Sequence, residues 1–200
     1  MGELRDQDGL TEEEFLAGYN ADRYPKPSAT ADICVIASDW ETAEILLIRR
    51  GGHPCLGQWA LPGGFANKNE PLEETAAREL LEETGITGVE LELVGVYSEP
   101  GRDPRGWTIS AAYGTVVEKE QVAVQAGDDA AAAAWFQVVY KEGEISLKQG
   151  DTILPVSAGA QEGTAKLAFD HRHIIDDAIK KIFLNDYHRR GNFWTQRKGN

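Results

Sequence analysis

Six glutamates crowd into residues 63–86, GGFANKNEPLEETAARELLEETGI, a stretch whose apolar spacing predicts an amphipathic helix. Pro71 suits the first turn and Gly85 suits the C-terminal stop, so we expect a helix from about residue 71 to residue 84. An apolar side chain recurs every four residues and forms a stripe that needs burial, made of Leu72, Ala76 and Leu80. The charged face of the same helix needs a separate explanation.

This face carries Glu79, Glu82 and Glu83 at spacings i, i+3 and i+4, so their carboxylates lie together. Each close pair of like charges destabilises a helix by about 0.2–0.5 kcal/mol. A solvated surface is one interpretation, because acidic helices are common. The other is a divalent cation such as Mg²⁺, which takes oxygen ligands and turns the repulsion into binding. Arg78, next to Glu79, has a guanidinium that can hold a carboxylate in place.

The flanking segments predict an α/β fold. Two β-branched runs, 31–38 and 44–50, are strand candidates joined by the short turn SDWET, which favours an antiparallel hairpin. Further strands are expected within 89–99, 106–117 and, in preference to an alanine-rich helix, 134–139. An amphipathic helix is expected over 171–186. This order of elements indicates helices packed on a mixed sheet.

The remaining segments are peripheral or irregular. Residues 1–30 form a polar extension in which Thr11 and Glu14 make a capping box, followed by a proline-containing linker. The Gly- and Pro-rich residues 51–65 predict an irregular loop that packs Trp59 and Leu61 inward.

Charge and composition limit the classes of function. The formal net charge of −13 argues against broad nucleic-acid binding, which depends on Lys and Arg. It leaves phosphorylated small molecules open, because divalent cations bridge acidic sites and anions. No apolar run reaches the roughly 20 residues of a membrane span, and the acidic N-terminus is no secretory signal. Only two cysteines are present, outside any CxxC pattern, so we expect a cytoplasmic protein without membrane association.

The acidic helix and the loop before it resemble the Nudix box, the 23-residue pattern G-x5-E-x7-R-E-U-x-E-E-x-G-U, in which U is apolar. Every fixed position is filled, by Gly64, Glu70, Arg78, Glu79, Leu80, Glu82, Glu83, Gly85 and Ile86. The resemblance implies a Nudix hydrolase domain over residues 31–186, with an α/β/α sandwich around a mixed β-sheet. It also implies cleavage of a nucleoside diphosphate linked to another moiety, with Mg²⁺ or Mn²⁺ as cofactor.

The resemblance implies a role for each charged residue of the box. Glu79, Glu82 and Glu83 would be metal ligands, and one of them would help to deprotonate the attacking water. Arg78 would orient Glu79. Glu70 and the carbonyl oxygen of Gly64 would complete the metal shell.

Two further segments, YSEPGRDPRGWTISAAY and KLAFDHRHIIDDAI, resemble the branch that contains bacterial ADP-ribose pyrophosphatases and Nudix-related transcriptional regulators. Arg102 and Arg105 would grip phosphate or ribose oxygens, and ion pairs with Asp103 are the alternative. Phe169 and His171 would lie near the substrate, and a structural place at the start of the helix is the alternative for the histidine.

Three more side chains have two interpretations each. Phe65 is expected to contact the substrate, although a role as a loop anchor, like that of Trp59, is also open. Asp128 and Asp129 precede a strand, where they form either an extra metal-binding carboxylate pair or an ordinary acidic turn.

The resemblance favours hydrolysis of ADP-ribose to AMP and ribose 5-phosphate. One alternative is a sensor that binds ADP-ribose and regulates transcription. Such relatives carry a winged helix after the Nudix domain, and the basic residues 187–200 are too few for one. Another alternative is a different substrate, such as a nucleotide sugar, a dinucleoside polyphosphate or an oxidised nucleotide. We expect a homodimer, because many relatives pair through their N-terminal segments and sheets.

Overall fold

The computed structural model describes residues 3–38, 42–119, 122, 130–157, 163 and 165–183. Its helices are α1 (Glu12–Gly18), α2 (Leu72–Thr84) and α3 (His171–Ala178), which continues as the π-helical turn η2 (Ile179–Phe183). The strands are β1 (Ser28–Ser38), β2 (Ala43–Arg50), β3 (Trp59–Ala60), β4 (Gly63–Phe65), β5 (Glu92–Tyr97), β6 (Thr108–Val117), β7 (Ala130–Lys141), β8 (Glu144–Gln149) and β9 (Thr152–Pro155).

The described strands join one mixed sheet in the order β5-β6-β1-β2-β7-β8-β9, with β3 paired to β2 and β4 paired to β1. Strands β1 and β6 run parallel, and the other described pairings are antiparallel. The expected hairpin between β1 and β2 is confirmed, with Ile36 opposite Ile45. Its turn, residues 39–41, lies outside the described residues.

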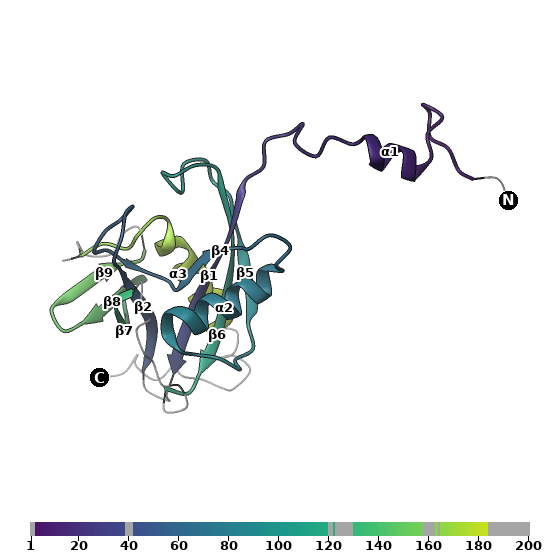
Figure 1. Ribbon diagram of the computed structural model, residues 1–200. Helices are drawn as coiled ribbons and strands as arrows, with labels where there is room; N and C mark the ends of the chain where they lie inside the picture. The colour runs from purple at the N-terminus through teal and green to yellow at the C-terminus, as the bar shows by residue number, and fades with distance from the viewer. Residues whose placement is uncertain are drawn as a thin grey trace.

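Helices cover both faces of this sheet, which confirms the expected α/β/α sandwich (Figure 1). Successive residues of β1 point to opposite faces. Ile36 packs in the core cluster that contains Ile174 of α3. Its neighbour Val35 packs in the other cluster, with Ala76 and Leu80 of α2. The apolar stripe of α2 is therefore buried as predicted, and its acidic face stays free for other contacts.

Some elements differ from the sequence-based expectation. The strand predicted over residues 134–139 is confirmed but is longer, because β7 also takes in the alanines that precede it, through pairing with β2. The loop over residues 51–65 contains the two short strands β3 and β4, and the hairpin β8–β9 was not predicted at all. The last helix is α-helical only to Ala178, and residues 184–186 lie outside the described residues. None of the described helices has the length and apolar character needed to cross a membrane.

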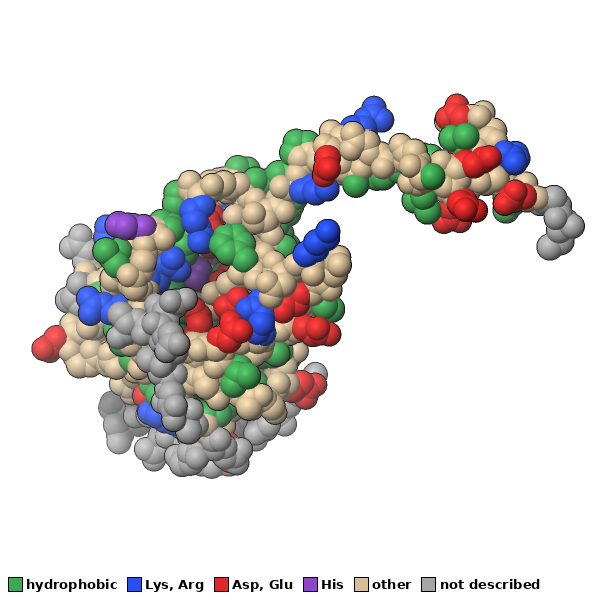
Figure 2. All heavy atoms as spheres, viewed as in Figure 1, with side chains coloured by type: hydrophobic (Ala, Val, Ile, Leu, Met, Phe, Trp, Pro, Cys, Tyr) green, Lys and Arg blue, Asp and Glu red, His purple; other side chains and the backbone are tan. Residues whose placement is uncertain are grey.

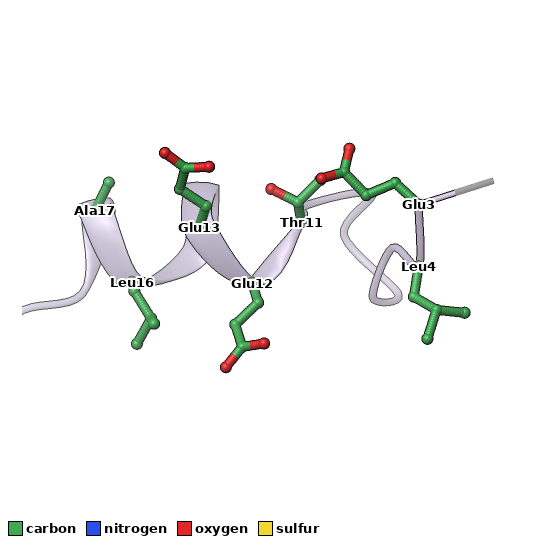
Figure 3. Close-up of a pocket in the computed structure, with 7 residues that line it drawn as sticks. All are labelled: Glu3, Leu4, Thr11, Glu12, Glu13, Leu16 and Ala17. Atoms are coloured by element: carbon green, nitrogen blue, oxygen red, sulfur yellow. The ribbon is translucent and has the colours of Figure 1, made fainter. Parts of the chain in front are cut away.

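Residues 3–27 form an arm that extends away from the sandwich (Figure 1). Helix α1 begins at the predicted capping box, in which Glu14 N–H donates to Thr11 Oγ1 at 3.2 Å and Thr11 N–H donates to the Glu14 carboxylate at 2.8 Å. No residue of α1 is buried, and Leu16 is 60% exposed. A hollow of about 730 Å³ along the arm is lined by Glu3, Leu4, Thr11, Glu12, Glu13, Leu16 and Ala17 (Figure 3). None of these residues belongs to the acidic motif.

Candidate functional site

Arg78 lies at the centre of the acidic cluster on α2. Its guanidinium donates to Glu70 at 2.8 and 3.0 Å, to Glu79 at 2.6 Å and to Glu82 at 3.1 Å. It also donates to the carbonyl oxygen of Phe65 at 3.1 Å, which ties the loop before the helix to the helix itself. One cation thus compensates several carboxylates that would otherwise repel one another.

Glu70 is fixed from several sides at the start of α2. It accepts hydrogen bonds from Arg78, from Asn67 N–H at 2.8 Å and from Thr75 Oγ1 at 2.9 Å. These donors favour the ionised carboxylate and hold the pKa of Glu70 far below its usual range. The same ion pairs raise the pKa of Arg78.

Glu83 points towards β4 rather than towards Arg78. Its carboxylate accepts Gly63 N–H at 2.8 Å. The pKa of Glu83 is raised to about 7; burial is the main cause and the nearby charge of Glu79 acts in the same direction, whereas Gly63 N–H and Arg50 act in the opposite direction. A carboxyl group with a pKa near neutrality is typical of functional sites.

Two adjacent glycines allow this close packing. A Cβ at Gly63 would lie 2.3 Å from the carbonyl oxygen of Ala31 and 2.9 Å from Asp32 Oδ1. A Cβ at Gly64 would lie 2.4 Å from Glu79 Oε1. The glycines therefore let β4 run against β1 on one side and let the Glu79 carboxylate approach the backbone on the other.

The donor set of the cluster fits a hard divalent cation. Glu79, Glu82 and Glu83 offer carboxylate oxygens from one helix, and Gly64 offers backbone beside Glu79. In the described part of the chain, no three acidic, His or Cys side chains converge closely enough to enclose an ion. Arg78 occupies the carboxylates of Glu79 and Glu82, and Gly63 N–H occupies that of Glu83, so binding of an ion requires rotation of these side chains.

A cleft of about 80 Å³ adjoins the cluster and shares strand β4 with it. The space-filling view shows acidic side chains gathered over α2, beside a hollow with basic side chains at its edge (Figure 2). The cleft is lined by Thr30, Asp32, Arg50, Leu61, Gly63, Gly64, Phe65, Arg102, Asp103, Arg105, Phe169 and His171. The structure thus brings together all five residues expected at the substrate, namely Phe65, Arg102, Arg105, Phe169 and His171.

Arg105 is the accessible arginine of the pair. Its guanidinium lies 4.7 Å from the ring centre of Phe65 and 5.6 Å from that of Phe169, and it makes a two-pronged ion pair with Asp103. The side chain is 42% exposed at the mouth of the cleft. The Asp103 pair is the alternative named for this loop, and it uses Nε and Nη2 of the guanidinium but not Nη1.

Arg102 lies deeper and is only 5% exposed. It donates to both carboxylate oxygens of Asp170, at 2.8 and 2.7 Å, and lies 3.5 Å from Asp32. Its expected grip on phosphate remains a prediction, because most of its donors already have partners within the fold.

His171 is buried at the start of α3, and both interpretations of this residue have support. It lines the cleft, and its Nδ1 accepts Leu61 N–H at 2.9 Å, which is a structural contact. Burial lowers the pKa of His171 below its ordinary value. A neutral imidazole that accepts at Nδ1 carries its proton on Nε2, and this nitrogen lies 3.6 Å from Asp32 Oδ1.

Sequence reasoning missed several residues of the cleft. Arg50 lies at the end of β2, with its guanidinium 5.0 Å from the ring centre of Phe169. Thr30 and Asp32 come from β1, where an acidic residue in an otherwise apolar strand was the available signal. The candidate pair Asp128 and Asp129 lies outside the described residues.

A mixed sheet between helices, with a glutamate-rich helix beside an arginine-lined cleft, characterises a known class of proteins. The NUDIX domain family matches residues 26–139, more than half of the chain. The protein belongs to this family.

Three relatives illustrate the similarity. The chain is 37% identical over 137 residues to an ADP-ribose pyrophosphatase of Methanocaldococcus jannaschii, covering 68% of this chain and 66% of that protein. It is 41% identical over 105 residues to the ADPR responsive transcriptional repressor NtrR of Acinetobacter baylyi, covering 52% and 42%. The match therefore spans less than two thirds of either relative. The NUDIX domain of Shewanella oneidensis NrtR, solved in complex with ADP ribose, superposes with a TM-score of 0.66 at 28% identity, covering 86% of this chain and 98% of that one.

Proposed function

We propose that this protein hydrolyses the pyrophosphate bond of ADP-ribose, with Mg²⁺ or Mn²⁺, and releases AMP and ribose 5-phosphate. The observation that carries the proposal is the complete acidic motif, held by Arg78, next to a cleft that contains Arg50, Arg102 and Arg105. The relative from M. jannaschii is named an ADP-ribose pyrophosphatase, and the Shewanella domain was solved with ADP ribose.

The chain's own residues divide the work between binding and activation. Arg50 and Arg105 lie at the cleft and are suited to bind the phosphate oxygens of the ligand, because a guanidinium matches them with paired donors. Arg78 orients Glu79 and Glu82. A divalent cation held by the glutamates would neutralise the phosphate oxygens and activate water.

Glu83 is the box carboxylate best suited to accept a proton. Its burial raises its pKa, and a carboxylate of raised pKa takes up a proton more readily than its neighbours. In the reaction, the water oxygen forms a bond to one phosphorus, the bridging P–O bond breaks, and the leaving phosphate takes the electron pair. The proton of the water goes to the carboxylate and then to solvent.

A second candidate is a regulator that binds ADP-ribose with little hydrolysis. The 41% identity to the repressor NtrR favours it. Such a regulator would bind ADP-ribose in the same cleft, and the acidic box would contribute to binding but not to hydrolysis. Turnover separates the two candidates.

We also propose that the protein forms a homodimer through its N-terminal arm. The arm exposes Leu4, Phe15, Leu16, Tyr19 and Tyr24 to between 46% and 91%. Seven residues are too few for a helix to be stable alone in water, so α1 requires a packing partner. In a homodimer, each arm has a second copy of the chain as its packing partner.

The proposed activity is tested by AMP release from ADP-ribose with Mg²⁺, next to a panel of other nucleoside diphosphates. We expect turnover that falls about a hundredfold or more in Glu82→Gln, since charge stabilisation at a reacting phosphate is lost. Glu74→Gln, the same change on an exposed residue at a variable position of the box, is the matched control and should retain activity. Tight binding of ADP-ribose without AMP release would support the regulator instead, and turnover of another compound would replace only the substrate.

A further inference from the structure

The floor of the cleft holds two polar side chains of β1 that no motif assigns. Thr30 and Asp32 are two residues apart, so both point to the same face of the sheet, about 7 Å apart along the strand. They are 6% and 7% exposed. Polar groups so deeply buried normally have partners within the protein.

Thr30 lacks such a partner. Within the described residues, its Oγ1 is buried and makes no hydrogen bond. A strand position opposite Phe65 and Ser110 would suit valine equally well by shape, and valine would avoid the desolvation of a hydroxyl. The unpaired hydroxyl at the cleft therefore points to a partner that comes from outside the chain.

Asp32 is only half engaged by the fold. Its Oδ2 accepts Ser110 Oγ–H at 2.5 Å and lies 3.5 Å from Arg102. Its Oδ1 faces His171 Nε2 at 3.6 Å, which is too long for a hydrogen bond. Because Leu61 N–H occupies Nδ1, the Nε2–H of a neutral His171 points towards the same space. An acceptor and a donor thus lie side by side at the floor of the cleft.

We propose that Thr30 Oγ1 and Asp32 Oδ1, with His171 Nε2–H, bind hydroxyl groups of a ribose of the ligand. This inference rests on the proposed function, since it names the part of ADP-ribose that the floor recognises. A carboxylate accepts hydrogen bonds from hydroxyl groups, as an acidic residue does from the ribose in dinucleotide-binding folds. The same negative charge repels phosphate, so the diphosphate is directed to Arg50 and Arg105 and the neutral sugar to the floor.

A purely structural role for Thr30 and Asp32 explains fewer of these contacts than ligand binding does. As a counter-ion for Arg102, Asp32 would need only its Oδ2 side. That role leaves the unpaired Thr30 hydroxyl without a reason, and it predicts that replacing Thr30 has no effect on ligand binding.

The test is Thr30→Val, which removes the hydroxyl and keeps the shape of the side chain. Its matched control is Thr115→Val, because Thr115 is equally buried on the neighbouring strand β6 but points to the opposite face of the sheet. Both changes are made in the Glu82→Gln background to suppress turnover, and the dissociation constant of ADP-ribose is measured by calorimetry with Mg²⁺. We expect Thr30→Val to weaken binding about fivefold or more, while its melting temperature stays the same or rises by about 2–4 °C.

Two analogues identify the ribose. ADP lacks the terminal ribose, and 2′,3′-dideoxy-ADP-ribose lacks both hydroxyls of the adenosine ribose. One analogue should have the same dissociation constant for the Glu82→Gln protein with and without Thr30→Val. That analogue lacks the hydroxyl group that Thr30 recognises. Asp32→Asn should weaken ADP-ribose binding about tenfold or more, because a hydroxyl bond to a charged acceptor is stronger.

Three results would overturn the inference: unchanged affinity of Thr30→Val for ADP-ribose, an equal loss with all three ligands, or a lowered melting temperature that explains weaker binding. Failure of the proposed function is distinguishable. If the wild-type protein binds ADP-ribose without releasing AMP, the proposed hydrolysis is contradicted but ribose recognition by Thr30 and Asp32 is not. If the wild-type protein does not bind ADP-ribose, both proposals are contradicted.

Discussion

The carboxylate of Glu79 lies so close to the backbone of Gly64 that a Cβ on this glycine would fall 2.4 Å from Glu79 Oε1. Helix α2 and strand β4 thus approach each other at the acidic cluster, and the absence of one methyl group sets the place of one carboxylate. The neighbouring Gly63 is as crowded, but by backbone atoms of β1. Because one glycine contacts a side chain and the other contacts backbone, alanine substitutions at the two positions should have different effects.

Gly64→Ala should fold with near-native stability and lose activity. The new methyl group meets the end of the flexible Glu79 side chain, which can rotate away, so the unfolding free energy should change by less than about 1 kcal/mol. The displaced carboxylate can no longer act with Glu82 and Glu83, and we expect AMP release to fall at least tenfold. Thermal unfolding and an ADP-ribose assay test both statements.

Gly63→Ala is the matched comparison. Its methyl group would lie 2.3 Å from the carbonyl oxygen of Ala31, which cannot move without shifting β1. We expect a loss of about 2 kcal/mol or more in unfolding free energy. Equal stability of the two variants would contradict the stated packing.

Arg78→Lys should reduce activity although it conserves charge. Lysine offers a compact ammonium group and cannot bridge Glu70, Glu79 and the carbonyl oxygen of Phe65 at once, as the guanidinium does. We expect kcat/KM to fall about 10–100-fold and Mn²⁺ affinity, measured by electron paramagnetic resonance, to fall with it. Arg49→Lys, an exposed arginine outside the cluster, should leave both unchanged.

His171 should make the fold sensitive to mild acid. Burial lowers its pKa, as do the nearby charges of Arg102 and Arg50, whereas Asp32 and Asp170 act in the opposite direction. The unfolded chain takes up a proton below about pH 6.5, but the folded protein does so only at lower pH. The free energy of unfolding therefore falls as pH drops through 6.5, by up to about 1.4 kcal/mol per pH unit until the folded-state pKa is reached.

Urea unfolding at pH 7.5 and pH 5.5 measures this effect. His171→Gln keeps an acceptor for Leu61 N–H and removes the titration, so its stability should change less between the two pH values than that of the wild type. The exposed His53→Gln is the control and should behave like wild type. An identical pH dependence in all three proteins would contradict the assignment.

The arm should determine the oligomeric state. Phe15→Glu combined with Leu16→Glu places charge on two exposed apolar side chains of α1. If the arm packs on a second copy, the double variant should be monomeric at concentrations where the wild type is dimeric, as measured by light scattering. Glu12→Gln with Glu13→Gln is the control on the same helix. A monomeric wild type would refute the proposed pairing.

The sequence alone determined the acidic helix, because its signals are local. The spacing of Glu79, Glu82 and Glu83, the apolar stripe and the terminal Gly85 all act within a few turns of one helix, where periodicity translates directly into geometry. The core strands β1 and β2 were predictable for the same reason.

The tertiary structure decided the partners within the cleft. Arg102 pairs with Asp170, 68 residues away, and His171 meets Leu61 across 110 residues. Thr30 and Asp32 become part of a site only because residues of β4 and α3 line the same cleft as these residues of β1. Likewise, the strand predicted over 134–139 extends back to Ala130 because the preceding alanines pair with β2 in spite of their helical preference. Such choices depend on contacts between segments far apart in the chain, and local preference carries no information about them.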